Sequence, residues 1–276
     1  MASTLASKVT LPTLRRALLY GTLPPFLTSP NHPLTPFHPV PSNTKTLTKS
    51  LAFGFHVDNV TYDLEDSIPS TQKAPARAHL AAHLTTLSHP DGKQQPPRFG
   101  EIAVRINAFS TGLAVDDLRA VAAQPSVDAI VVPKVNSAED LSVIDEIIRD
   151  VAPDRAKPLK LLALIESARA VMDLREICQA TPSLAGLIFA AEDFAADTGV
   201  RRTRSLNEMA YARSAVVTAA RAFRLESAID LVCVDLSLEC GAMRLRPETS
   251  KARAFGFDGK REWGFRLSLS LSPPPG

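Results

Sequence analysis

Short apolar runs rich in β-branched residues alternate with segments of helical periodicity from about residue 57 onward. The apolar runs predict buried strands at 57–63, 102–106, 129–133, 161–165, 186–190 and 229–234, with an earlier strand at 16–20. Between them, the periodicity predicts helices at 73–87, 115–123, 138–149, 168–179 and 205–223. Strands that alternate with helices in this way form parallel sheets. Seven of them predict an α/β protein of the TIM (β/α)8 barrel class, closed or nearly closed.

Two stretches interrupt this alternation. Residues 21–39 contain six prolines and little charge, which excludes a helix or a central strand and predicts an irregular insert after the first strand. Residues 261–276 end in Ser/Leu alternation and a proline run, with no sign of a finished eighth unit. We therefore expect a flexible N-terminus at 1–14, a barrel at 15–260 that is incomplete at its C-terminus, and a disordered tail at 261–276.

The overall charge is nearly balanced, with 31 Lys and Arg against 29 Asp and Glu. This balance argues against nucleic acid or an anionic membrane as a partner. No apolar run approaches the roughly 20 residues that cross a bilayer. The three cysteines, Cys178, Cys233 and Cys240, form no CxxC pair and are predicted to be structural, in a reducing compartment. Small-molecule chemistry is the default expectation.

The first 57 residues contain no Asp or Glu but carry Lys8, Arg15, Arg16, Lys45 and Lys49. This bias is typical of a mitochondrial targeting segment, and it is equally compatible with a disordered N-terminus of a cytoplasmic protein. Mitochondrial and cytoplasmic locations are both kept as hypotheses.

Charged and amide residues directly follow several predicted strands. They are Asp63, Glu65, Asp66, Arg105, Asn107, Lys134, Glu166 and Asp193. In a β/α barrel the carboxyl ends of the strands converge on one rim, where active sites are built. The sequence therefore predicts that these residues surround one pocket.

Charges at the end of an apolar strand are costly to bury unless they are paired or bound to a metal ion. Several carboxylates with one Arg and one Lys suit Mg²⁺, which is held by one or two carboxylates with waters and substrate oxygens. These segments contain no His, which argues against zinc. The alternative is a set of ion pairs around the barrel mouth, with Asp63 and Asp66 capping the next helix.

Two other polar segments have simpler interpretations. Glu139 and Asp140 look like the first turn of a helix with Ser137 as its N-cap. Arg201, Arg202 and Arg204 are interpreted as a solvated loop, with contact to an anionic substrate as the alternative.

Eight short segments resemble one family, the citrate lyase β-subunit-like proteins of the HpcH/HpaI aldolase superfamily, which are TIM-barrel carbon–carbon lyases. The segments are RRALLY at 15–20, YDLEDS at 62–67, VRIN at 104–107, VPKV at 132–135, ALIES at 163–167, AAEDF at 190–194, YARS at 211–214 and FGFDGK at 255–260. Lys73 and Arg77 follow the second segment as they do in the family. The segments occur in family order, which makes the resemblance specific.

The resemblance implies that Glu166 and Asp193 bind Mg²⁺. It also implies that Arg105 holds carboxylate or carbonyl oxygens of the substrate. Asp63 and Glu65 would join Arg105 in catalysis, and Asp66 and Lys134 would contact substrate. The implied substrates are citryl-, malyl- or citramalyl-CoA thioesters, or 2-oxoacids, cleaved through a metal-stabilised enolate. The implied assembly is a homotrimer or hexamer.

The chain departs from the family pattern at two places. The Val-Pro-Gly turn expected after the first strand is displaced by the insert, and residues 40–42 resume the pattern without the Gly. The family's Ile-His-Pro segment and C-terminal region, which supplies a catalytic Asp to a neighbouring subunit and covers CoA, do not follow Lys260. An unspliced intron or an altered reading frame would account for both departures. Two further hypotheses are thus a non-catalytic metal-binding or partner subunit, and a truncated barrel with exposed strand edges that does not fold stably.

Overall fold

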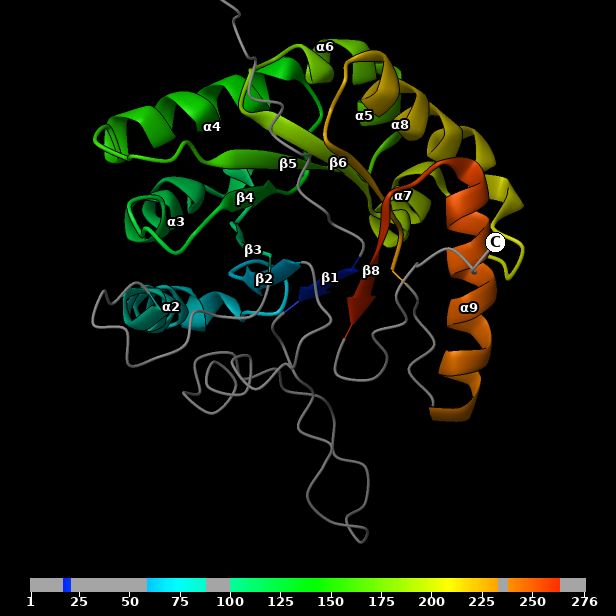
Figure 1. Ribbon diagram of the computed structural model, residues 1–276, viewed down its shortest axis with the longest axis horizontal. Helices are drawn as coiled ribbons and strands as arrows, with labels where there is room; N and C mark the ends of the chain where they lie inside the picture. The colour runs from blue at the N-terminus through cyan, green and yellow to red at the C-terminus, as the bar shows by residue number, and fades with distance from the viewer. Residues whose placement is uncertain (1–16, 21–58, 88–99, 233–237, 264–276) are drawn as a thin grey trace, which may run out of the picture.

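The computed structural model describes residues 17–20, 59–87, 100–232 and 238–263, and within them eight parallel strands form a closed barrel (Figure 1). The strands lie in sequence order around the barrel. They are β1 (Ala17–Tyr20), β2 (Asn59–Asp63), β3 (Glu101–Arg105), β4 (Ala129–Val132), β5 (Lys160–Ile165), β6 (Leu184–Phe189), β7 (Ser227–Asp230) and β8 (Gly259–Trp263). The predicted TIM-like barrel architecture is confirmed.

Helices cover the outside of the barrel (Figure 1). They are α2 (Lys73–Leu87), α3 (Ala114–Val121), α4 (Ala138–Val151), α5 (Ala168–Met172), α6 (Leu174–Cys178), α7 (Ala191–Thr198), α8 (Ala210–Ala222) and α9 (Leu238–Phe255). Short 3-10 turns precede α2, α3 and α8: η1 (Ser70–Gln72), η2 (Phe109–Thr111) and η3 (Asn207–Met209). The helix predicted at 73–87 has these bounds, whereas the one predicted at 168–179 is two helices that meet at Asp173.

The barrel end differs from the sequence expectation. β8 pairs with β7 and, from Lys260 to Trp263, with β1, so the eighth strand closes the barrel. Arg261, which was assigned to a tail outside the fold, is a buried residue of this strand. The predicted boundary at residue 260 is therefore corrected to include residues 261–263. The predicted insert, the N-terminal segment and residues 264–276 lie outside the described residues.

The inside of the barrel is divided into an apolar side and a polar side. Small and branched apolar residues from β3 to β7 form an interior cluster, which includes Val131, Leu162 and Ile188. On the side of β2 and β3, the buried Asn59 donates to Glu101 Oε2 (2.7 Å), and Thr61 Oγ1 donates to Asn59 Oδ1 (2.7 Å). These polar contacts belong to the strands that end at the charged residues of the rim.

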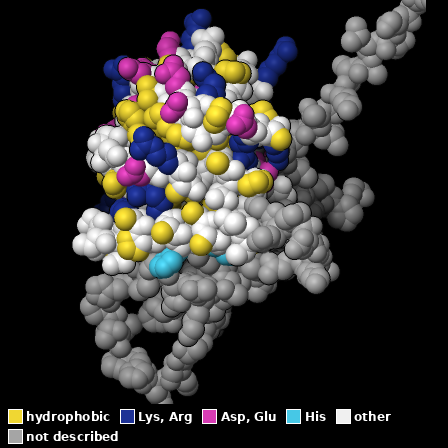
Figure 2. Space-filling view, turned by 90° about the vertical axis from the view of Figure 1, so that its left-hand side faces the viewer, with side chains coloured by type: hydrophobic (Ala, Val, Ile, Leu, Met, Phe, Trp, Pro, Cys, Tyr) yellow, Lys and Arg dark blue, Asp and Glu magenta, His cyan; other side chains and the backbone are white. Residues whose placement is uncertain are grey.

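The surface shows no separation of charge on the face that Figure 2 presents, the side of α2, α3 and α4. Basic and acidic side chains are interspersed there among apolar ones. Among the helices of the described ranges, none combines the length and the apolar character needed to cross a membrane.

Candidate functional site

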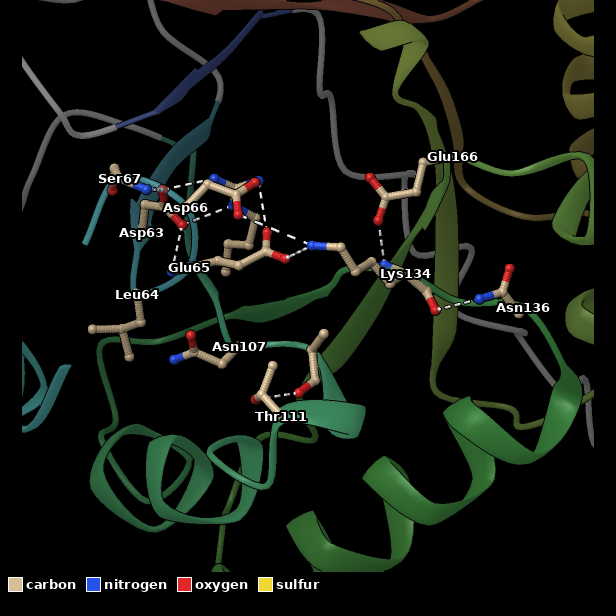
Figure 3. Close-up of polar contacts among 12 residues, drawn as sticks. Asp63, Leu64, Glu65, Asp66, Ser67, Asn107, Thr111, Lys134, Asn136 and Glu166 are labelled. Carbon is tan, nitrogen blue, oxygen red and sulfur yellow. Dashed lines mark hydrogen bonds and ion pairs between the residues drawn. The ribbon is translucent and has the colours of Figure 1, made fainter. Parts of the chain in front are cut away.

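The strand ends bring most of the predicted site residues together at one rim of the barrel (Figure 3). Asp63 ends β2 and Arg105 ends β3, while Lys134 and Glu166 follow β4 and β5. Asp193 lies in the first turn of α7, directly after β6. The close-up shows Glu65 and Glu166 on opposite sides of Lys134.

Arg105 and Asp63 form a buried, two-pronged ion pair. Arg105 Nε donates to Asp63 Oδ1 and Nη2 donates to Oδ2, both at 2.7 Å. The backbone N–H groups of Glu65 and Ser67 also donate to the Asp63 carboxylate, at 2.9 and 3.3 Å. Burial alone would raise the pKa of Asp63, but Arg105 and these hydrogen bonds lower the pKa overall. Asp63 is therefore an ionised partner that orients Arg105, and it does not cap α2, which begins at Lys73.

Glu65 lies between the two cations of the rim. Its Oε2 is 2.8 Å from Arg105 Nη1, and its Oε1 accepts a hydrogen bond from Lys134 Nζ at 2.8 Å. Burial raises the pKa of Glu65 even though both cations oppose this. Asp66 is exposed and lies farther away, 3.7 Å from Arg105 Nη1 and 4.0 Å from Lys134 Nζ. Arg105 and Lys134 thus converge on one carboxylate position.

Lys134 contacts both Glu65 and Glu166, one through its side chain and the other through its backbone. Its side chain contacts Glu65, and its backbone N–H donates to Glu166 Oε1. The Lys134 backbone is left-handed, with φ of 53°, and its carbonyl accepts from Asn136 Nδ2 at 3.2 Å. A non-glycine residue with positive φ is uncommon and often marks a functional position. The turn directs the N–H and the ammonium toward two different carboxylates.

Glu166 and Asp193 form a carboxylate pair with too little positive charge around it. Glu166 is buried, with 6% of its surface exposed, whereas Asp193 is exposed. Burial first, and then the negative charge of Asp193, raises the pKa of Glu166 to about 8. The Glu166 carboxyl is therefore mostly protonated at neutral pH unless a cation compensates its charge.

This donor set fits Mg²⁺ better than zinc. In the described part of the chain, no three or more His, Cys, Asp or Glu side chains gather into a possible metal site. The site offers two carboxylates, Glu166 and Asp193. Mg²⁺ commonly takes one or two carboxylates from a protein and keeps waters and substrate oxygens as its other ligands. Zinc would require a larger set that includes His or Cys.

The remaining candidates have structural explanations. Ser137 caps α4, as predicted, and the structure adds a capping box between Ser137 and Asp140. Arg202 pairs with Glu192 and donates to the carbonyl of Val232 at 2.9 Å, which ties α7 to the end of β7. Cys178 is buried and free, and burial raises the pKa of its thiol to about 12, which is consistent with a structural role. The side chains of Cys233 and Cys240 lie outside the described residues.

One neighbouring network was not predicted. Asn107 donates to Asp117 Oδ2 through its backbone N–H (2.8 Å) and its side-chain amide (2.6 Å), and Arg77 Nε donates to Asp117 Oδ1 (2.8 Å). Asp117 lies in the first turn of α3 and is 1% exposed. Acidic residues in a first helical turn are common, so the sequence contained no signal that Asp117 faces the site.

Comparisons with known proteins give relatives that match most of the chain. Citrate lyase subunit beta of Leuconostoc mesenteroides subsp. cremoris is 31% identical over 224 residues, which are 80% of this chain and 70% of that protein. The mitochondrial citramalyl-CoA lyase of Rattus norvegicus is 27% identical over 266 residues, 91% of this chain and 75% of that protein. Both are lyases by name.

A solved structure and a family match extend the comparison to the fold. Protein CitE from Mycobacterium tuberculosis, in complex with magnesium and acetate, is 26% identical, with a TM-score of 0.63 over 91% of this chain and 86% of that chain. Residues 39–262 match the HpcH/HpaI aldolase/citrate lyase family, and the match reaches into β8, which the sequence had placed partly in a tail outside the family. The chain therefore belongs to the HpcH/HpaI aldolase/citrate lyase family.

Proposed function

We propose that this protein is a Mg²⁺-dependent carbon–carbon lyase that acts on a CoA thioester of a hydroxy di- or tricarboxylic acid, of the citryl-, malyl- or citramalyl-CoA type. One observation carries the proposal. A carboxylate pair suited to Mg²⁺, Glu166 and Asp193, lies across Lys134 from a second group in which Arg105 and Lys134 converge on one carboxylate. A substrate with a carbonyl and a carboxylate needs these two kinds of contact.

The chemistry requires charge stabilisation at one oxygen atom. When the bond between the α and β carbons of the thioester breaks, the electron pair stays on the α carbon and is delocalised into the thioester carbonyl as an enolate, which then takes up a proton. The β carbon, which carried the hydroxyl group, becomes the carbonyl carbon of the other product. Mg²⁺ held by Glu166 and Asp193 would supply positive charge near that oxygen. Arg105 adds N–H donors that Asp63 holds in a fixed direction, so little reorganisation is needed as the negative charge develops.

Glu65 is the group we assign to proton transfer. Lyase cleavage removes the proton of the substrate hydroxyl, and a base accepts that proton more readily when its pKa is closer to neutrality. Burial raises the pKa of Glu65, and the carboxylate lies between Arg105 and Lys134. A substrate carboxylate that binds these two cations would share them with Glu65 or displace it. Asp66, which is exposed beside both cations, would line the entrance.

The relatives support the substrate class. Their names include a citrate lyase subunit and a citramalyl-CoA lyase, and the solved relative contains magnesium and acetate. They also include a mitochondrial protein and bacterial ones, so both locations proposed from the sequence have precedents. By resemblance to the family, we propose a homotrimer or hexamer, which sedimentation of the purified protein would test.

The direct test is a panel of citryl-, malyl- and citramalyl-CoA, with acetyl-CoA release measured with Mg²⁺ and with EDTA. We expect release from at least one thioester, dependent on Mg²⁺ and abolished in Glu166→Ala. Glu176→Ala is the matched control, because Glu176 is an exposed glutamate on α6. Binding of Mg²⁺ and CoA in calorimetry without any turnover would instead select a non-catalytic binding subunit.

A further inference from the structure

Lys73, the first residue of α2, uses all of its hydrogen-bond donors on the loops of the site. Its Nζ donates to the carbonyl oxygens of Leu64 (2.9 Å) and Glu65 (2.7 Å) and to Asn107 Oδ1 (2.6 Å). An ammonium group has three N–H donors and no acceptor. These three contacts therefore leave no donor for a substrate.

Two of the three acceptors belong to the backbone that presents Glu65. The same loop is held from within, because the N–H groups of Glu65 and Ser67 donate to Asp63 and the N–H of Ile68 donates to the Glu65 carbonyl. Lys73 fixes the carbonyl side of the loop, whereas Arg105 and Lys134 contact the Glu65 carboxylate. The Glu65 backbone and the Glu65 side chain are thus held by different cationic residues.

The third acceptor connects this loop to the next strand end. Asn107 follows Arg105 by two residues, and it donates twice to Asp117, which Arg77 contacts on its other oxygen. Lys73 and Arg77 lie four residues apart on α2. A continuous chain of polar contacts therefore links α2, α3 and the loops that follow β2 and β3.

We propose that Lys73 is a positioning residue: it locks the loop 64–66 against Asn107, so that Glu65 and Arg105 face the substrate in one fixed arrangement. This inference rests on the proposed lyase function. A direct role in binding substrate phosphate or carboxylate is disfavoured, because the three donors are already used. Burial lowers the pKa of Lys73, but the neighbouring carboxylates of Asp63, Glu65, Asp66 and Asp117 oppose this and favour the charged form.

The test compares Lys73→Met with the unmodified protein in two measurements. The first is hydrogen–deuterium exchange of the peptide that covers residues 62–72, which does not depend on activity. The second is steady-state kinetics on the best thioester of the panel, together with the Kd for Mg²⁺. Lys73→Arg is the second variant if Lys73→Met does not fold, because it keeps the charge but cannot direct three donors to the same acceptors. Lys157→Met is the control. Lys157 is an exposed lysine in the loop before β5, at the end of the barrel opposite the site, and it pairs with Asp128.

We expect faster exchange in residues 62–72 and a loss in kcat/KM of about 10- to 100-fold with a raised KM, as misplaced binding groups produce. The Mg²⁺ affinity should change less than about twofold, since Glu166 and Asp193 are not contacted by Lys73, and Lys157→Met should match the unmodified protein. Unchanged exchange, or an unchanged kcat/KM in a variant whose exchange is faster, would overturn the positioning role. If the unmodified chain cleaves none of the thioesters, the proposed function fails, and the exchange comparison alone decides whether Lys73 locks the loop.

Discussion

In the proposed metal site, Glu166 would couple Mg²⁺ binding to the loss of a proton. Its pKa is raised to about 8 by burial and by Asp193, so the carboxyl is mostly protonated at pH 7 when no cation is bound. A carboxyl group must lose its proton to bind a metal ion. The carboxyl that the sequence predicted as a ligand is thus mostly neutral in the metal-free protein, which relieves the repulsion between the buried Glu166 and the exposed Asp193.

This coupling predicts that Mg²⁺ binding strengthens as pH rises. Below the raised pKa, each bound ion must release a proton, so the affinity should rise by up to about tenfold per pH unit from pH 6 toward 8 and then level off. Calorimetry in buffers of different ionisation enthalpy would count the released proton. Mg²⁺ affinity that is independent of pH over this range would contradict the assignment.

At the scale of elements, a buried charge cluster connects the last two strands of the barrel, β7 and β8, to the helices α8 and α9. Arg213 on α8 donates to both oxygens of Asp230 at the end of β7, at 3.0 and 2.7 Å, and both side chains are almost completely buried. Lys260 on β8 lies 3.9 Å from Asp230 and 3.1 Å from Glu248 on α9. The Arg213 guanidinium also stacks over Phe255, 4.2 Å from the ring centroid. Four elements therefore meet at one set of charges.

Removal of one member of this cluster should destabilise the fold strongly. Arg213→Met leaves Asp230 buried without its two-pronged partner, and breaking such a pair costs about 3–5 kcal/mol. Urea unfolding would measure the loss. Arg169→Met is the control, because Arg169 is exposed and pairs with Asp173 four residues away on the surface, where about 0.5 kcal/mol is expected. Equal effects of the two substitutions would show that the buried cluster does not stabilise this part of the barrel.

At the scale of the whole molecule, periodicity predicted the seven strands β1 to β7 but missed β8. Arg261 is at the same register level as Asn59 and Glu101, since Arg261 and Asn59 both pair with Leu18 and Asn59 pairs with Glu101. β8 itself has the sequence GKREW, with no apolar run, so an apolar pattern could not reveal the strand. α7 was missed because the acidic residues that open it follow β6 directly, and α9 contains Pro247.

The candidate site was predictable as a set of residues but not as a set of contacts. Charges that follow apolar strands identified Arg105, Lys134 and Glu166, because parallel strands end at the same rim. The sequence could not show that Asp63 would use both oxygens on Arg105, or that Lys134 would take a left-handed backbone. Such contacts depend on distances between segments far apart in the chain.

Closure of the barrel by β8 gives a further prediction. A chain that ends at residue 263 keeps the pairs that join residues 17–20 to β8, whereas a chain that ends at 260 loses three of the four. The first should unfold cooperatively in urea, and the second should lose cooperativity because strand edges are left open. If the two chains unfold alike, residues 261–263 do not contribute to closure.

The central claim is that Glu166 and Asp193 hold a Mg²⁺ ion on which carbon–carbon cleavage depends. The most direct measurement is the rate of acetyl-CoA release as Mg²⁺ is added back to EDTA-treated protein, for the unmodified chain and for Asp193→Asn. We predict a rate that rises from near zero and saturates in the unmodified chain, and that in Asp193→Asn stays near zero or needs at least tenfold more Mg²⁺. A rate that does not depend on Mg²⁺, or that Asp193→Asn leaves unchanged, would contradict the claim.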